Sequence, residues 1–204
     1  MIPDGTLFRH VSVTLAEALI GFFAGTLCGI LIAILLWCSP MLEEIMDPYL
    51  VVINSLPKIA LGPVIIVWVG SGYSSIITVT LLISVVCTVL GVLAGFHETD
   101  EEKILLLKSF GASRWQIFRF AVFPSGIPSM ISVLKINVGM TWVGVIVGEF
   151  LVSKAGLGYL IVYGGQVFRM DLVMGSVVIL CILAAVMYYL VAIAEKRVKR
   201  FLAE

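Results

Sequence analysis

The stretch ETDEEKILLLKSFGASRWQIFRFAVFPSGIP, residues Glu98–Pro128, is the one long water-compatible segment in an otherwise apolar chain. Its acidic start favours a helix N-terminus, and Lys108 suits the opposite end of the helix dipole. Gly111 is placed to end that helix in the left-handed conformation. Ser113 followed by Gln116 is a capping-box pattern that opens a second helix. The segment therefore predicts two short amphipathic helices joined at a glycine elbow.

The end of this segment leads back into apolar sequence. Pro124 and Pro128 are predicted to break the second helix and to turn the chain into the next span. Such a segment either lies on the lipid headgroups or binds a soluble protein. A helix on the membrane surface does not require a fixed glycine elbow, so we favour a docking element for a cytosolic partner.

Outside this segment the composition is that of a membrane protein. Hydrophobic residues make up 61% of the 204 residues and charged residues 13%, with a mean hydropathy of +1.14, whereas a soluble domain is about half apolar and a quarter charged. The length allows about five spans of roughly 20 residues. A turn at Gly70–Ser75 divides the longest uncharged run. The predicted spans are Ala18–Trp37, 48–69, 76–96, Ile127–Phe150 and Leu172–Ala194. We expect an all-α polytopic helix bundle, with residues 1–204 forming a single transmembrane domain and residues 97–126 forming a loop.

Lysine and arginine are distributed unevenly between the two sides of these spans. The side that holds the loop and the C-terminus carries Lys103, Lys108, Arg114, Arg119, Lys196, Arg197, Lys199 and Arg200. The other side carries Arg9, Lys154 and Arg169. The positive-inside rule therefore places the loop and the C-terminus in the cytoplasm. Five spans then put the N-terminus outside, which without a cleavable signal predicts a further span ahead of this chain.

Polar residues within the spans are candidates for a translocation path, because they are costly in lipid and usually face a cavity or another helix. Pro57 frees backbone carbonyls in mid-span, so the second span is predicted to be a broken helix that borders the path; in the alternative, Lys58 extends to an interface. Glu149 ends the fourth span and is expected to meet external water. The candidate path residues are Asn54, Ser55, Pro57, Lys58, Asn137, Thr141 and Glu149.

Other features of the spans predict structure more than function. Gly21, Gly25 and Gly29 repeat every four residues, which indicates a small-residue face for close helix packing. Lys135 lies about two turns into the fourth span and is expected to extend to the cytoplasmic face.

Several kinds of chemistry have no signature in this chain. The four cysteines show no metal-like pairing and the two histidines lie far apart, so no metal site, catalytic site or cofactor is predicted. There is no G-x-x-x-x-G-K-[ST] phosphate loop, so any ATP hydrolysis must belong to a partner.

The ordered motifs resemble the inner-membrane permease subunits of ABC importers, over roughly residues 10–195. The resemblance to their EAA loop rests on Gly111-Ala112-Ser113-Arg114-Trp115-Gln116-Ile117-Phe118 and Phe123-Pro124. Resemblance to the nitrate, sulfonate and taurine branch rests on Leu56-Pro57, Gly62-Pro63, Trp68-Val69-Gly70, Gly148-Glu149-Phe150 and Gly156-Leu157-Gly158-Tyr159-Leu160-Ile161. The chain departs from the family where Leu105-Leu106-Leu107 replaces Glu-Ala-Ala, so the resemblance does not supply the usual acidic contact.

The resemblance implies a type I importer permease core, the MetI-like fold, in the cell membrane. It implies a cytosolic ATPase dimer that uses ATP, a second permease copy that most simply forms a homodimer, an extracytoplasmic solute-binding protein and surrounding lipid, with no role for nucleic acid. The residues expected to couple to the ATPase are Lys108, Gly111, Ala112, Ser113, Arg114 and Pro124. The solute would be small: nitrate, a sulfonate, taurine or a vitamin precursor.

Two other functions are compatible with the same spans. An ion-coupled secondary transporter could use Lys58 and Glu149 as a charge pair, but it would be expected to show internal repeats, and none is convincing here. A membrane scaffold could use the polar loop only to recruit a soluble protein.

Overall fold

The computed structural model describes the backbone of residues 6–203 and the side chains as far as Arg197, and helices account for nearly all of it. Lys199 and Arg200, which contributed to the predicted orientation, lie outside the residues with described side chains. In chain order the elements are α1 (Thr6–Cys38), α2 (Pro40–Ser55), the 3-10 helix η1 (Lys58–Leu61), α3 (Gly62–Val69), α4 (Tyr73–His97), α5 (Glu101–Ser109), α6 (Arg114–Ile117), the π-helix η2 (Phe118–Val122), α7 (Phe123–Val152), α8 (Leu157–Gln166) and α9 (Met170–Ala203).

Four continuous helical stretches of the described chain are long and apolar enough to cross a membrane: Thr6–Cys38, Tyr73–His97, Arg114–Val152 and Met170–Arg197. A fifth span is obtained if the pair Pro40–Ser55 and Lys58–Val69 is counted as one. This pair is bent by 86°, so the helix break predicted at Pro57 is present. It begins at Pro40, earlier than the predicted residue 48, because proline is well tolerated at the first helical turn.

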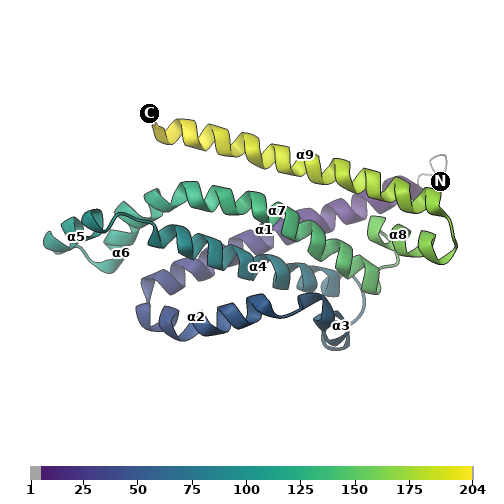
Figure 1. The fold of residues 1–204 in the computed structure, drawn as a ribbon, viewed down its shortest axis with the longest axis horizontal. Coiled ribbons are helices and arrows are strands. Elements are labelled where there is room, and N and C mark those ends of the chain that lie inside the picture. Colours follow the sequence, from purple (N-terminus) through teal and green to yellow (C-terminus); the bar gives the residue numbers. More distant parts are fainter. Residues whose placement is uncertain (1–5, 204) are drawn as a thin grey trace.

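Two further features differ from the sequence-based expectations. The stretch 151–171 between the last two predicted spans, which was expected to be a glycine-rich loop, contains a further helix, α8, which lies beside α9 at the end of the bundle that holds the N-terminus (Figure 1). The prediction that Pro124 and Pro128 break the second helix of the polar segment is wrong, because α6, η2 and α7 follow one another without interruption from Arg114 to Val152. The widened π turn just before Pro124 accommodates a residue that has no backbone N–H to donate.

The centre of the bundle is formed by α1, α4 and α7, and the predicted glycine face of α1 packs there. Gly21 lies against Thr80, Gly25 against Ser84 and Gly29 against Thr88, so each glycine meets a small side chain at the same interval on α4. A Cβ atom on Gly21 or on Gly29 would lie 2.5 Å from its threonine, which is too close for a real contact. The small-residue prediction is confirmed, and it explains how two long spans approach each other so closely.

The outer helix α9 is the least buried span and runs along one face of the bundle (Figure 1). Its C-terminal half is tied to α7 by an ion pair between Lys135 Nζ and Glu195 Oε2 at 2.7 Å. The expectation that Lys135 extends to an interface did not foresee this partner, which lies 60 residues further along the chain.

Candidate functional site: the elbow, the helix break and the buried carboxylate

The elbow forms as its sequence predicts. Asp100 caps α5 by accepting a hydrogen bond from the Glu102 backbone N–H at 2.9 Å. At the other end Gly111 adopts a φ of +76°, and its N–H donates to the Lys108 carbonyl at 2.9 Å. No atom outside its immediate neighbours lies within 4 Å of the place where a Cβ would stand. Glycine is therefore required here by backbone conformation and not by crowding.

The capping box that opens α6 is also present. The Gln116 side chain accepts from the Ser113 N–H at 2.7 Å, and the Ser113 hydroxyl accepts from the Gln116 N–H at 3.3 Å. Two N–H groups that a helix start leaves without partners are satisfied reciprocally. The two helix ends on either side of Gly111 are thus both fixed by local hydrogen bonds, which makes the elbow a defined shape.

Arg114 connects the elbow to the first span. Its Nη2 atom donates to the Trp37 carbonyl at 2.9 Å, and its guanidinium lies over the Trp37 ring, 5.3 Å from the centroid. This carbonyl is in the last turn of α1, where carbonyl groups lack helical partners and a cation is favourable. Phe118 then packs between Trp37 and Phe96, with ring centroids 5.3 and 5.4 Å apart. The elbow is therefore held to the ends of α1 and α4.

The leucine triplet that replaces the acidic signature is divided between two faces of α5. Ile104 and Leu107 pack against the core cluster around Phe96 and Phe118. Leu105 and Leu106 face outward and remain 60% and 57% exposed. Helix α5, which lies at the tip of the bundle (Figure 1), thus carries exposed apolar side chains.

The helix break exposes polar groups within the second span. Asn54, Ser55 and Pro57 are exposed and Lys58 is half-buried. The Lys58 ammonium donates to the backbone carbonyl and to the side-chain oxygen of Asn54, both at 3.2 Å. The Ser55 hydroxyl bonds the Val52 carbonyl at 2.9 Å. Side chains at the break therefore satisfy some of the carbonyls that end α2.

The other three candidate path residues lie elsewhere, inside the helix packing. Asn137 and Thr141 are fully buried on the face of α7 that meets α1, and the Asn137 amide donates to the Thr26 hydroxyl at 2.7 Å. Glu149 is 1% exposed, so the expectation that it meets external water is wrong. The structure therefore separates the predicted set into an exposed group at the break and a buried group along α7.

Glu149 instead caps the helix that the sequence did not predict. Its carboxylate accepts from the Gly158 N–H at 2.5 Å and from the Thr14 hydroxyl at 2.6 Å. Thr14 in turn accepts from the Leu157 N–H at 2.8 Å. The backbone N–H groups of Gly156, Leu157 and Gly158 at the start of α8 would otherwise lack acceptors. The Gly156 N–H completes the set by donating to His10 Nδ1 at 2.9 Å.

This cluster explains the two glycines at the start of the Gly156–Ile161 motif, and it includes residues that were not predicted from the sequence. A Cβ on Gly156 or Gly158 would collide with the Glu149 side chain, so both glycines are required for the close approach. His10, Thr14 and Glu17 were not recognised as a group. Their spacing on α1 (i, i+4, i+7) places them on one face of the helix, and that polar stripe in an apolar span was the available signal.

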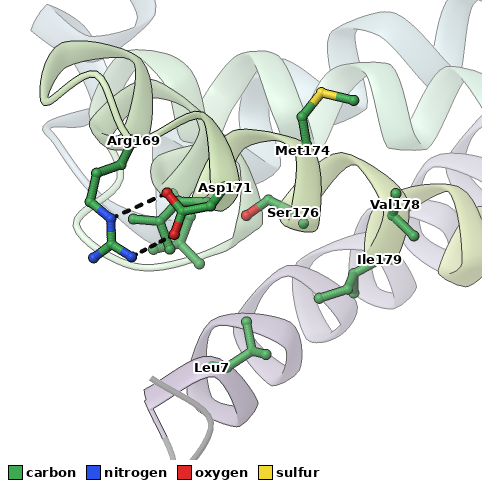
Figure 2. Close-up of a pocket in the computed structure, with 10 residues that line it drawn as sticks. Leu7, Arg169, Asp171, Met174, Ser176, Val178 and Ile179 are labelled. Atoms are coloured by element: carbon green, nitrogen blue, oxygen red, sulfur yellow. Dashed lines mark hydrogen bonds and ion pairs between the residues drawn. The ribbon is translucent and has the colours of Figure 1, made fainter.

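A cavity of about 720 Å³ lies near the same end of the bundle, between α1, α8 and the start of α9. Figure 2 shows Leu7 of α1 and Ile179 of α9 on its walls and the Arg169–Asp171 ion pair at one end. The hydrogen bonds from Arg169 to Asp171 raise the pKa of its guanidinium. Asp171 thus offsets the charge of Arg169, and the rest of the described lining is largely apolar.

Comparison with known proteins gives consistent matches. The family described as "Binding-protein-dependent transport system inner membrane component" matches residues 25–202. A probable ABC transporter permease protein of Haemophilus influenzae is 30% identical over 183 residues, which cover 90% of this chain and 75% of that protein. The taurine transport system permease protein TauC of Escherichia coli is 28% identical over 181 residues, 89% of this chain and 66% of that protein.

A third relative and a solved structure extend the comparison. The formylaminopyrimidine transport permease protein ThiX of Halalkalibacterium halodurans is 31% identical over 158 residues, 78% of this chain and 63% of that protein. The chain thus spans a little under two thirds of the length of two of these relatives. A structure of the MetNI methionine ABC transporter in an inward-facing conformation matches with a TM-score of 0.80 at 22% identity, covering 97% of this chain and 96% of that one. The fold is therefore that of the MetI-like permeases.

Proposed function

Because the chain belongs to the family of binding-protein-dependent transport system inner membrane components, we propose that it is the permease subunit of an ATP-driven importer of small solutes. The observation that carries this proposal is the elbow at Gly111. Both helix ends at the elbow are capped, it lies at the tip of an apolar bundle, and it is held to α1 through Arg114 and Trp37.

The elbow is the proposed contact for a cytosolic ATPase. Lys108 lies in the last turn of α5, and Gly111, Ala112 and Ser113 form the turn itself. Arg114 ties the elbow to α1, and Pro124 lies where it passes into α7. When ATP closes an ATPase dimer, the two attached elbows would move together. Motion would pass to α1 through the Arg114 contact and to α7 through the continuous helix, which changes access to the path from one side of the membrane to the other.

The translocation path is proposed to run beside the helix break. Backbone carbonyls at membrane depth are tolerated only where they are buried in protein or face a water-filled cavity. The break at Asn54–Lys58 is exposed on this protomer, so we place it on the face that meets a second permease copy, most simply in a homodimer. Asn137, Thr141 and Glu149 then hold the helices that frame the path and do not contact the solute.

The remaining parts of the proposal concern orientation, partners and solute. The excess of lysine and arginine supports a cytoplasmic position for the elbow and the C-terminus. An external binding protein would deliver the solute. Relatives are described as permeases for taurine, formylaminopyrimidine, riboflavin and aliphatic sulfonates. We propose a solute of this size range.

The test is reconstitution of the chain in vesicles with its cognate ATPase and binding protein. The solute to be tested is the one that the binding protein binds. Its uptake should require ATP on the side of the membrane that carries the ATPase, and it should persist when ion gradients are dissipated. Uptake that follows an ion gradient without ATP would favour a secondary transporter. ATPase recruitment without any uptake would favour the scaffold.

A further inference from the structure

The cation at the helix break has a charge that the described structure does not neutralise. Lys58 lies within the second span, where an ionisable side chain is costly unless it has a partner. Two other cations, Lys135 and Arg169, each pair with a carboxylate. Among the ion pairs between described side chains, none involves Lys58.

Within the described chain, the helical elements next to Lys58 bring no acidic residue to the break that could pair with it. The acidic residues of α2 are Glu43, Glu44 and Asp47, all in its first half, and Asp47 lies about two turns before Asn54. η1 and α3 contain no acidic residue, and neither does α4, on which the break packs. Among these described elements, no carboxylate is therefore placed to neutralise Lys58.

The hydrogen bonds from Lys58 to the C-terminal end of α2 neither use all of its donors nor offset all of its charge. The two acceptors on Asn54 use two of the three ammonium donors and leave one unused. The end of a helix carries roughly half a negative elementary charge, so it offsets only part of the lysine charge. Asn54 accepts through its oxygen, and its amide nitrogen still has two N–H donors to offer. The break thus combines a partly uncompensated cation with spare donors on an exposed surface.

We propose that Lys58 and Asn54 bind an anionic group of the transported solute, a carboxylate or a sulfonate, as it passes the helix break. This inference rests on the proposed function and adds the class of solute to it. Charge-assisted hydrogen bonds from the ammonium to an oxyanion are stronger than those it makes to the neutral Asn54 oxygens. An anionic solute would therefore accept the hydrogen bonds from the Lys58 ammonium that Asn54 accepts when no solute is bound.

A native cysteine, Cys87, can be used as a probe of the charge at the helix break. Cys87 of α4 is half-buried, and η1, which carries Lys58, packs against α4. In a variant that carries Cys28→Ala, Cys38→Ala and Cys181→Ala, Cys87 is the remaining thiol of this chain. The rates at which it reacts with small charged thiol reagents then measure the charge at the break, with the permease kept in its complete complex.

Three reagents are needed: sulfonatoethyl methanethiosulfonate (anionic), trimethylammonioethyl methanethiosulfonate (cationic) and methyl methanethiosulfonate (neutral). After correction for their rates with a free thiol in solution, the anionic reagent should react roughly tenfold faster than the cationic one, which is about 1.4 kcal/mol in activation free energy. Lys58→Met should abolish this preference and Lys58→Arg should keep it. Lys154→Met, which removes an exposed cation elsewhere, is the matched control and should leave it unchanged.

Binding of the anion itself is tested with the neutral reagent. At matched ionic strength, ethanesulfonate should slow the modification of Cys87 several-fold, and ethylammonium should not. Equal protection by the two ions, a corrected rate ratio near one, or no reaction of Cys87 with any reagent would each overturn the inference. ATP-dependent uptake by the same complexes is measured separately, so loss of ATP dependence would refute the proposed function independently of the thiol results.

Discussion

Gly111 is the residue whose replacement tests the elbow most directly. Its φ of +76° lies in the left-handed region, where a β-branched side chain is strongly disfavoured. Gly111→Val should cost about 1–3 kcal/mol locally and move α5 relative to α6. We expect ATP-driven uptake in reconstituted vesicles to fall roughly tenfold or more, with the bundle still folded.

Two variants control for the change in side chain. Gly111→Asn should retain most activity, because asparagine tolerates the left-handed conformation. Gly139→Val adds the same side chain at a helical glycine with open space around it and should also be well tolerated. Normal uptake and ATPase stimulation in Gly111→Val would contradict the proposed role of the elbow.

Glu149 gives a second prediction for a single residue, which concerns thermal stability. Its carboxylate accepts hydrogen bonds from Thr14 and from the start of α8, so it must present acceptors only. Glu149→Gln keeps the shape but replaces one acceptor oxygen by an NH₂ group. An unsatisfied buried donor costs about 1–3 kcal/mol, so thermal unfolding in detergent should begin several degrees lower. Glu44→Gln, at an exposed position on α2, is the control; equal unfolding temperatures for the two variants would count against the cap.

The contact between α1 and α4 allows a prediction for a pair of elements. A Cβ on Gly25 would overlap the Ser84 hydroxyl, which makes no hydrogen bond within the described structure. Gly25→Ala should therefore separate the helices and destabilise the protein by about 1–3 kcal/mol. Adding Ser84→Ala removes the colliding atom and should restore most of the loss, as measured by thermal unfolding of both variants. No recovery in the double variant would mean that the helices are not packed in this register.

Local sequence was a good guide wherever the structure is determined by neighbouring residues. The Gly111 cap and the Ser113–Gln116 box depend on contacts within a few positions, and both were predicted correctly. The break at Pro57 follows from the missing N–H of proline. The repeat of Gly21, Gly25 and Gly29 also needed only the period of a helix.

The sequence was less informative where a partner lies far away in the chain. Glu149 looked like a residue at the end of a span, because its donors Thr14 and Gly158 belong to two other elements. Lys135 looked unpaired, since nothing nearby indicates Glu195. The continuity of α6, η2 and α7 past Pro124 depends on a π turn, for which the sequence has no simple signature.

The orientation of the whole molecule can be tested with single cysteines in a background without the four native ones. Lys108→Cys lies on α5, beside the elbow, and Lys154→Cys lies between α7 and α8, near the opposite end of the bundle. In intact cells, a membrane-impermeant thiol reagent should label Lys154→Cys, and it should label Lys108→Cys only after permeabilisation. The reverse pattern would place the elbow outside the cell and exclude contact with a cytosolic ATPase.

The unbroken passage from the elbow into α7 has a mechanical consequence. Helix α7 has 30 residues, so it is about 45 Å long at 1.5 Å per residue. A lever of that length converts a tilt of about 5° at one end into a displacement of about 4 Å at the other. The far end carries Glu149 and, through it, the start of α8. A small rotation that an ATPase imposes at the elbow would thus arrive at the opposite face of the membrane as a shift comparable to the width of a small solute.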